Sequence, residues 1–382
     1  MRTRILILTM TVLCLSPGLH FTPSAYAQDL LHMLVGTYTE GSTSEGVYLY
    51  TFNQEDGTAT LLDSAPAGNP SFVVADKKGR YAYSVNEYND GRQAVSSYSL
   101  KDDKIRLLNS EPTDFGEISG ADPCNLLLMD KFLISSNYTG GSITVFEVEW
   151  RGTLSPQQQC FTFSEVKTTK ALWSKKKKKQ DAHMHCAVLT PDGKYVLATN
   201  LGNDCIHRFK IVEGESPLVD DGFAFEYSRH RQAGPRHMVF SADGKFAYLL
   251  CELDDLLTVF SYNDGMLTEL MTISAYGGKG HGSADIHLSP DGKYLYTSHR
   301  LAGDGISVFS VDPSTGLVKN VGFHPTGRHP RNFAITPNGK YLLCACRDDD
   351  VIEVYSINPD SGLLKSTGQT IRLGKPVCVQ FY

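Results

Sequence analysis

The chain has 382 residues and a formal net charge of -6 at pH 7, so it presents no overall basic field, and nucleic acid is not an expected partner. Its length alone would suggest two or three domains, an estimate that does not apply to a chain built of repeats. Its nine cysteines include no CxxC pair and do not suit a small disulfide scaffold, so most are expected to be buried thiols.

The first residues predict a secretory signal peptide. Arg2 and Arg4 precede an apolar run over residues 5–15, and Ala25-Tyr26-Ala27 is a small-x-small cleavage pattern before Gln28. The run is too short to cross a bilayer, and nothing downstream approaches the roughly 20 apolar residues that a membrane-spanning helix needs. A lipoprotein would be processed at Cys14, but the bulky Leu13 disfavours that. We therefore predict a signal peptide over residues 1–27 and a soluble periplasmic or secreted domain over residues 28–382.

A short turn phrase recurs along the rest of the chain. Its typical form is Pro-Asp-Gly-Lys-Tyr, and Asp-Gly or Asn-Gly between apolar runs predicts a tight hairpin. Full copies cover residues 76–81, 191–195, 242–246, 290–294 and 337–341, and a copy at residues 129–132 is shortened by the loss of its glycine. A fixed period of this kind indicates a repeat architecture.

Each repeat also contains an alternating run that ends in an aromatic-x-apolar pattern, typical of a strand with one buried face. The aromatic positions are Tyr50, Tyr98, Phe146, Phe209, Phe260, Phe309 and Tyr355. They are separated by 48, 48, 63, 51, 49 and 46 residues, the length of one four-stranded propeller blade. The long step contains Trp173 and Lys175 to Lys179, which we interpret as a solvated loop insertion. Seven aromatic positions predict seven blades.

The strands that precede the turns also number seven. They begin at Ser71, Cys124, His185, Arg236, Ala284, Arg331 and Val377. The last of these strands has no turn after it, and the segment over residues 33–52 has no strand before it. The sequence therefore predicts an all-β, seven-bladed propeller in which N-terminal and C-terminal strands complete one blade together, a closure that leaves no open sheet edge.

Propeller geometry selects the candidate site residues. The first strand of a blade lines the channel and the second runs antiparallel to it, so the start of one and the end of the other share a face. First-strand starts contribute His185, Arg236 and Arg331, with His237 beside them. Second-strand ends are Glu87, Tyr138, Leu201, Glu252, Arg300 and Arg347. Strand-end charges can simply be solvated or paired with one another, but this many cations at one mouth favour an anionic or carbonyl-bearing ligand.

The sequence gives less support for a metal site or a covalent nucleophile than for a bound anion or carbonyl. His183 and His185 could share a metal, with His237, Asp285 and His287 completing the site, but no recognised zinc spacing is present and His287 lies deeper in the channel. A GxSxG nucleophile motif is also missing from the sequence. We therefore predict no metal and no cofactor.

Several phrases resemble the lactonase family of seven-bladed propellers, which includes the bacterial propeller-type 6-phosphogluconolactonase and the fungal carboxy-muconate lactonising enzyme. They are residues 234–240 (Gly-Pro-Arg-His-Met-Val-Phe), residues 251–253, residues 284–292 (Ala-Asp-Ile-His-Leu-Ser-Pro-Asp-Gly) and His299-Arg300. The resemblance covers essentially the whole mature chain. It implies a catalytic set of His185, Arg236, Glu252 and Arg300, the same face that strand geometry selects.

The resulting hypothesis is a lactonase that hydrolyses a sugar lactone. His185 is our first choice of general base, because Glu252 near two arginines should stay ionised. Arg236 and Arg300 would stabilise the oxyanion. The predicted substrate-binding residues are Arg331, Arg347, His237, Glu87, Tyr138 and His287. The alternatives are a muconate-type cycloisomerase and a non-catalytic periplasmic binding propeller. The sugar-phosphate member of the family is cytoplasmic, so the export signal leaves open whether the lactone is phosphorylated.

Overall fold

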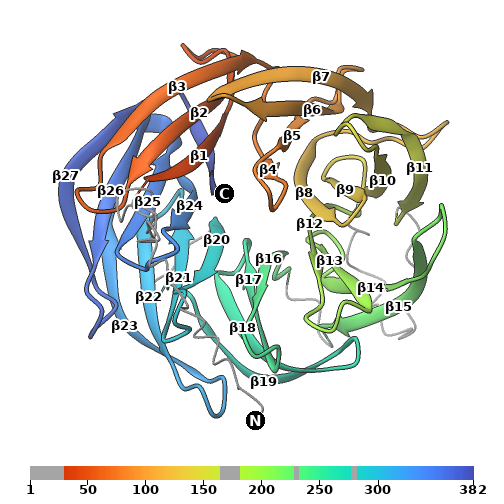
Figure 1. The fold of residues 1–382 in the computed structure, drawn as a ribbon. Coiled ribbons are helices and arrows are strands. Elements are labelled where there is room, and N and C mark those ends of the chain that lie inside the picture. Colours follow the sequence, from red (N-terminus) through yellow and green to blue (C-terminus); the bar gives the residue numbers. More distant parts are fainter. Residues whose placement is uncertain (1–29, 164–180, 228–231, 277–281) are drawn as a thin grey trace, which may run out of the picture.

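The computed structural model describes residues 30–163, 181–227, 232–276 and 282–382. The predicted signal peptide and the Lys175 to Lys179 segment lie outside these residues. The described chain forms seven four-stranded antiparallel sheets around a central axis, as Figure 1 shows. The all-β, seven-bladed propeller predicted from the repeats is confirmed.

Each blade runs from an inner strand beside the axis to an outer strand at the rim. The first blade contains β28 (Pro376–Phe381), β1 (Leu30–Thr37), β2 (Gly46–Asn53) and β3 (Ala59–Pro66). The second and third contain β4 (Val73–Ala75), β5 (Tyr81–Asn86), β6 (Ala94–Lys101) and β7 (Lys104–Pro112), then β8 (Pro123–Met129), β9 (Phe132–Asn137), β10 (Ser142–Val148) and β11 (Leu154–Thr162).

The remaining four blades repeat this order. They contain β12 (Met184–Leu189), β13 (Tyr195–Asn200), β14 (Cys205–Ile211) and β15 (Leu218–Glu226); β16 (Pro235–Phe240), β17 (Phe246–Cys251), β18 (Leu256–Asn263) and β19 (Met266–Ser274); β20 (Ser283–Leu288), β21 (Tyr294–His299), β22 (Gly305–Val311) and β23 (Val318–Pro325); and β24 (Pro330–Ile335), β25 (Tyr341–Cys346), β26 (Val351–Ile357) and β27 (Leu364–Arg372). A short 3₁₀ helix, η1 (Arg347–Asp349), follows β25.

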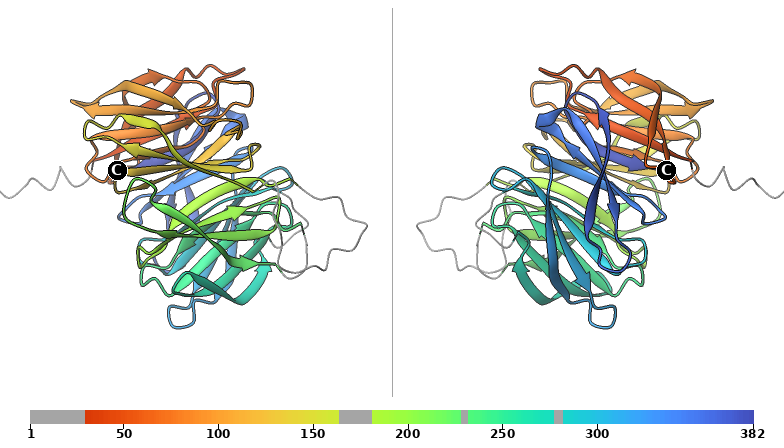
Figure 2. Two further views of the ribbon diagram at one scale, coloured as in Figure 1. Left: turned by 90° about the vertical axis from the view of Figure 1, so that its right-hand side faces the viewer. Right: turned by 90° about the vertical axis from the view of Figure 1, so that its left-hand side faces the viewer.

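The repeated turn phrases join the first and second strands of their blades. In the phrase at residues 191–195, Asp192 Oδ1 accepts hydrogen bonds from the Thr190 hydroxyl at 2.7 Å and the Lys194 N–H at 3.1 Å. Gly193 has a φ of +68°, which a side chain would disfavour. The seven repeated aromatic residues all lie on the third strand of their blades and are buried between neighbouring sheets. The side views in Figure 2 show these twisted sheets packed against one another.

The predicted closure of the ring is also confirmed. Strand β28 pairs antiparallel with β1, with Val35 opposite Val379. A side chain of the neighbouring blade reinforces the joint, because Asn332 Oδ1 accepts a hydrogen bond from the Val379 N–H at 2.7 Å. The first and last strands of the described chain therefore belong to one sheet (Figure 1).

An aspartate in the loop between the second and third strands ties four of the blades to the next one. Asp204, Asp255, Asp304 and Asp350 each accept a hydrogen bond from a backbone N–H at or just before the next inner strand. Asp255 is buried, and its Oδ1 accepts from both the N–H and the hydroxyl of Ser283, at 3.1 and 2.6 Å. Two of these backbone donors, the N–H groups of Gly234 and Ser283, are buried and would otherwise have no partner in the joint.

We expect Asp255→Ala to lower the free energy of unfolding by about 1–3 kcal/mol, because it leaves the Ser283 N–H unpaired in a buried joint. Urea denaturation followed by circular dichroism measures the change. Asp264→Ala is the matched control, since Asp264 makes only an exposed pair with Lys194. Equal stability of the two variants would show that these aspartates do not hold the blades together.

Candidate active site

The candidate site lies at one end of the channel, where the inner strands begin and the second strands end. Strand register brings the two sets together. Pro235 on β16 pairs with Cys251 on the antiparallel β17, and Arg236 and Glu252 lie one residue to either side of that pair. Arg300 directly follows β21, and His185 is the second residue of β12. Side chains from successive blades therefore meet around one mouth.

Glu252 holds two arginines in fixed positions. Arg236 Nε donates to Glu252 Oε2 and Arg300 Nη2 donates to Oε1, each at 2.8 Å. The side chains of Arg236 and Arg300 are only 2% and 5% exposed, whereas that of Glu252 is 21% exposed. Arg236 Nη1 also donates to the Ala284 carbonyl, and Arg300 Nε donates to the Gly282 carbonyl at 2.9 Å. We name this group of three charged residues the Glu252 clamp.

The clamp keeps Glu252 ionised. Burial alone would raise the pKa of the carboxyl, but Arg236 and Arg300 outweigh burial and lower it. Burial and the neighbouring Arg236 charge reduce the pKa of Arg300 to about 9, so its guanidinium still carries its charge at neutral pH. Glu252 therefore acts as a fixed carboxylate, as the sequence suggested, and is a poor proton acceptor.

His185 lies beside the clamp in an almost completely buried position. Its ring meets Tyr138 edge-on, with the centroids 5.7 Å apart, and the His237 ring with the centroids 5.1 Å apart. Burial, followed by the charge of Arg236, lowers the pKa of His185 well below its usual value, so the imidazole is neutral. Its Nδ1 is buried and has no hydrogen-bond partner among the described residues.

His237 is held by a buried aspartate. Its Nδ1 lies 2.8 Å from Asp285 Oδ1, and its Nε2 lies 3.3 Å from Arg236 Nη1. Asp285 Oδ2 lies 3.0 Å from His287 Nε2 and accepts from Asn332 Nδ2 at 2.5 Å. Burial opposes ionisation of Asp285, but His287 and His237 outweigh it and lower the pKa of the carboxyl. Burial and Arg236 reduce the pKa of His237 to about 4.

A second polar cluster lies around Glu87. The Tyr38 hydroxyl donates to Glu87 Oε1 at 2.8 Å, the Ser71 hydroxyl donates to Oε2, and Arg331 Nη2 lies 3.8 Å from Oε2. The Arg331 guanidinium also lies over the Tyr38 ring, 5.5 Å from its centroid. Burial opposes the charge of Arg331, but Tyr38 and Glu87 outweigh it and raise its pKa.

The other predicted residues occupy different surroundings. Tyr138 stacks on His183 with the ring centroids 4.4 Å apart, and Leu201 is a buried apolar residue. His287 is half-exposed, and its Asp285 partner outweighs burial to raise its pKa. Arg347 belongs to η1 and pairs with Asp348 at 2.7 Å rather than with the Glu252 clamp.

Residues that strand geometry did not select complete the mouth. His329 connects the clamp to η1, because its Nε2 lies 3.4 Å from Arg300 Nη1 and its Nδ1 lies 3.5 Å from Asp348. Tyr38, Ser71 and Asn332 were also missed as site residues. His329 lies two residues before Arg331, as His183 lies two before His185. A search extended to the segment before each inner strand would therefore have found it.

The arginines of the mouth already have protein counterions. Glu252 pairs with Arg236 and Arg300, while Glu87 lies near Arg331 and Asp348 pairs with Arg347. The sequence argument that these cations need an anionic ligand to relieve their repulsion is therefore incomplete, because carboxylates of the protein relieve most of it. An uncharged lactone can occupy this mouth as readily on electrostatic grounds.

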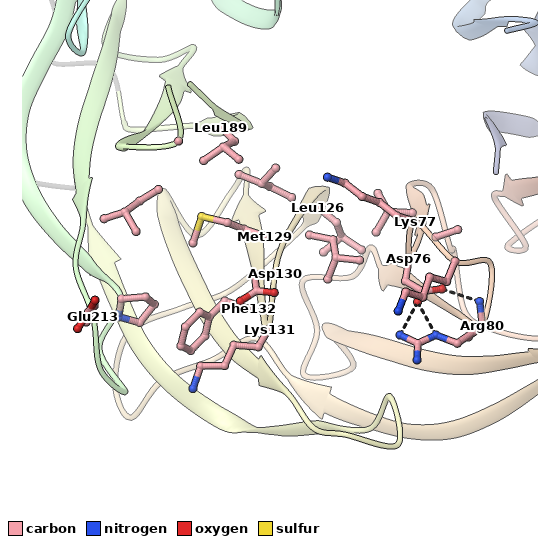
Figure 3. Close-up of a pocket in the computed structure, with 18 of the residues that line it drawn as sticks. Asp76, Lys77, Arg80, Leu126, Met129, Asp130, Lys131, Phe132, Leu189 and Glu213 are labelled. Carbon is pink, nitrogen blue, oxygen red and sulfur yellow. Dashed lines mark hydrogen bonds and ion pairs between the residues drawn. The ribbon is translucent and has the colours of Figure 1, made fainter. Parts of the chain in front are cut away.

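Cavities lie at both ends of the channel. On the mouth side, one of about 360 Å³ is lined by Tyr38, Glu40, Asn69, Arg347, Asp348 and Lys375. A small one of about 10 Å³ lies among the mouth residues Ser71, Phe72, Cys124, His185, Arg236, His237, Arg331, Asn332 and Val377. A much larger one of about 950 Å³ lies at the opposite end, between the β4–β5, β8–β9 and β12–β13 turns. Figure 3 shows Asp130 and Lys131 of the shortened third-blade turn beside it, with Arg80 bonded to Asp76. None of the predicted site residues lines this cavity of about 950 Å³.

Comparisons with known proteins agree with the architecture. The family model for the seven-bladed β-propeller lactonases matches residues 32–381. The 6-phosphogluconolactonase of Formosa agariphila is 34% identical over 82% of this chain and 88% of its own length. That of Bacillus subtilis is 30% identical over 91% and 97% of the two chains. The periplasmic gluconolactonase of Pseudomonas aeruginosa superposes with a TM-score of 0.82 at 31% identity, over 92% and 99% of the two chains.

Within the described residues, no helix is long and apolar enough to cross a membrane. The phrases that suggested the family, including Gly234 to Phe240 and Ala284 to Gly292, form the inner strands β16 and β20 and the residues around them. With the fold, the family model and the relatives in agreement, the chain belongs to the lactonase family of seven-bladed β-propellers.

Proposed function

We propose that this protein hydrolyses a sugar lactone of the gluconolactone type at the channel mouth. The observation that carries the proposal is the Glu252 clamp, which fixes two buried guanidiniums beside neutral histidines. Opening a lactone requires donors for the oxyanion that forms at the carbonyl and a proton acceptor for the attacking water. Both kinds of group meet at this mouth.

Arg236 and Arg300 have different roles at the mouth. Arg236 Nη2 has no hydrogen-bond partner among the described residues, so it can donate to a substrate oxygen while Nε and Nη1 hold the side chain in place. Arg300 contributes a second positive charge from the other side of Glu252. Fixed donors of this kind stabilise developing negative charge without reorganising. A neutral imidazole of the mouth removes the proton from water, and Tyr138, Glu87 and Arg331 bind the sugar hydroxyls.

The names of the relatives suggest two substrates. Those from Formosa agariphila and Bacillus subtilis are called 6-phosphogluconolactonases, and the Pseudomonas aeruginosa protein is called a periplasmic gluconolactonase. We propose that this protein is exported after cleavage behind Ala27 and acts in the periplasm or outside the cell. An exported enzyme with protein counterions for its mouth arginines suits an unphosphorylated lactone. With a phosphorylated lactone, Arg331 and Arg347 would receive the phosphate.

The purified mature protein is expected to accelerate the opening of gluconolactone in a pH-stat assay corrected for spontaneous hydrolysis, with 6-phosphogluconolactone tested in parallel. His185→Ala and Arg236→Ala should each lower kcat/KM by about 10²–10³-fold, because each removes a group that contacts the reacting atoms. Arg80→Ala is the matched control, since Arg80 pairs with Asp76 at the opposite end of the channel.

Wild-type rates in His185→Ala, Arg236→Ala and Glu252→Gln together would rule out this site. Conversion of a muconate without uptake of water would support the cycloisomerase alternative instead. Saturable binding of a lactone without turnover would support a binding propeller.

A further inference from the structure

The two mouth histidines have opposite proton placements. His237 Nδ1 faces the carboxylate of Asp285 at 2.8 Å, and a carboxylate can only accept, so Nδ1 carries the proton. His237 Nε2 is then an acceptor, which agrees with the Arg236 Nη1 donor 3.3 Å away. The Nε2 electron pair of His237 is therefore turned toward Arg236 Nη1, which is its donor at a long 3.3 Å.

His185 has no such support. Its Nδ1 is buried without a hydrogen-bond partner among the described residues, and a proton placed there would be a buried N–H without an acceptor. Buried unpaired N–H groups are rarer and costlier than buried unpaired acceptors. The proton therefore belongs on Nε2, which makes His185 a donor toward the channel rather than a proton acceptor.

Both rings line the small cavity at the mouth. Its volume of about 10 Å³ has room for about one water molecule. The polar groups that line it include His185, His237 and Ser71, and Arg331 and Asn332 contribute further donors. A buried water needs two to four polar partners, and this cavity supplies them within reach of the His237 ring.

We propose that Asp285 and His237 form the pair that activates water, and that His185 donates a hydrogen bond to the substrate. This inference rests on the proposed lactone hydrolysis and assigns the general base to a different histidine from the one favoured by the sequence. His237 is then a catalytic residue, whereas Asp285 is a positioning residue that acts through it.

The reaction balances with these groups alone. Arg236 Nη1 gives up its long contact with His237 Nε2, and Nε2 then takes a proton from the water as the water oxygen bonds to the lactone carbonyl carbon. The carbonyl electron pair moves onto its oxygen beside Arg236 and Arg300. The bond from this carbon to the ring oxygen then breaks as the carbonyl re-forms, and the proton on Nε2 passes to the ring oxygen. The product is the open hydroxy acid, which loses its carboxyl proton to solvent.

The charges that face His237 come from several blades. Arg236 adjoins it on β16, Asp285 and His287 lie on β20, and His185 lies on β12. Burial and Arg236 keep the free ring of His237 neutral at pH 7, and Asp285 opposes them, so it stabilises the protonated ring that forms in the transition state. The Asn332 and His287 contacts hold Asp285 at the correct angle from its other oxygen.

The direct test is the proton placement in the wild-type protein. Nitrogen NMR of ¹⁵N-histidine-labelled protein, assigned with His237→Gln and His185→Gln, should show a protonated Nδ1 in His237 and a protonated Nε2 in His185. A protonated Nε2 in neutral His237 would overturn the inference without any reference to activity.

The kinetic test uses Asp285→Asn, whose amide can donate to His237 Nδ1 and so move the ring proton to Nε2. We expect kcat to fall about 10³–10⁴-fold while KM changes less than about threefold, as for other base-orienting aspartates. His185→Gln should raise KM more than it lowers kcat. It should retain the acid limb of the pH profile, which is the fall of kcat as the catalytic base becomes protonated at low pH. His237→Gln, which can still donate to Asp285, should remove that limb.

Full kcat and an intact acid limb in both Asp285→Asn and His237→Gln would overturn the proposal. Should the wild-type protein open no lactone, the proposed function fails, while the NMR result still decides the proton placement. Thermal unfolding of each variant shows whether it is folded. Where a variant is not folded, the NMR spectrum of the labelled wild-type protein still decides which ring nitrogens carry the protons.

Discussion

Replacing Glu252 with glutamine should lower lactone turnover and should also lower the stability of the fold. The variant keeps the shape of the side chain but removes the charge that two buried guanidiniums share. An uncompensated buried charge costs about 3–5 kcal/mol. Loss of the fixed oxyanion donors should lower kcat by about 10²–10³-fold.

Urea denaturation and a pH-stat lactone assay on the same preparations measure the two effects. Glu147→Gln is the matched control, because Glu147 pairs with Lys131 in a solvated position on β10. Glu252→Gln with the stability and the rate of the control would mean that the clamp neither holds the arginines nor serves catalysis. Loss of activity with unchanged stability would confine Glu252 to a role in binding substrate.

The second large effect is a loss of stability as the pH falls below about 6.5. Five buried histidines have pKa values below the usual one because burial disfavours their charged form, namely His185, His207, His237, His299 and His329. Three of them, His207, His299 and His329, have a pKa of about 3. In the unfolded chain the same side chains take up protons near pH 6.5.

The sign of the effect follows from proton uptake. Between about pH 6.5 and the lowered folded-state values, the unfolded chain binds more protons than the folded one, so stability falls as the pH falls. Each histidine contributes up to about 1.4 kcal/mol per pH unit, and five together up to about 7 kcal/mol per unit. A typical domain has only about 5–15 kcal/mol to lose. His287 opposes the trend, because its raised pKa stabilises the fold as the pH falls.

We therefore expect the free energy of unfolding to fall as the pH is lowered from 7.5 to 5, measured by urea titrations followed by circular dichroism. His207→Gln, which removes a buried histidine far from the Glu252 clamp, should reduce the slope of unfolding free energy against pH by about 1.4 kcal/mol per unit. His32→Gln is the control, since the His32 side chain is 42% exposed. A fold whose stability is flat from pH 7.5 to 5 would contradict this account.

Much of the architecture could be predicted from local patterns. The Asp-Gly and Asn-Gly turns and the seven spaced aromatic residues are short-range signals, and each corresponds to a turn or a third strand in the structure. The closure between β28 and β1 could be predicted because an unmatched strand remained at each end. The interblade aspartates were missed, because a single aspartate in a loop does not indicate from sequence which backbone N–H it will meet.

The candidate site was predictable only in part. The starts of first strands and the ends of second strands placed His185, Arg236, Glu252 and Arg300 at one mouth, because position along a strand determines which end of the sheet a residue occupies. The same argument grouped Arg347 with them, yet the η1 turn directs its guanidinium to Asp348. Partner choice depends on side-chain directions that strand position does not specify.

The sequence by itself therefore determined the number of blades, their closure and the end of the channel where charged residues gather, since these depend on periods and turns encoded locally. Only the tertiary structure decided the pairings: Glu252 with two arginines, Asp285 with His237, and His185 without a partner for Nδ1. The pairings of Glu252 with Arg300 and of Asp285 with His237 join neighbouring blades, 48 positions apart in the chain, whereas Glu252 and Arg236 lie on one blade. Burial then sets the charge of each group, and it is burial and pairing together that distinguish a proton acceptor from a donor at this mouth.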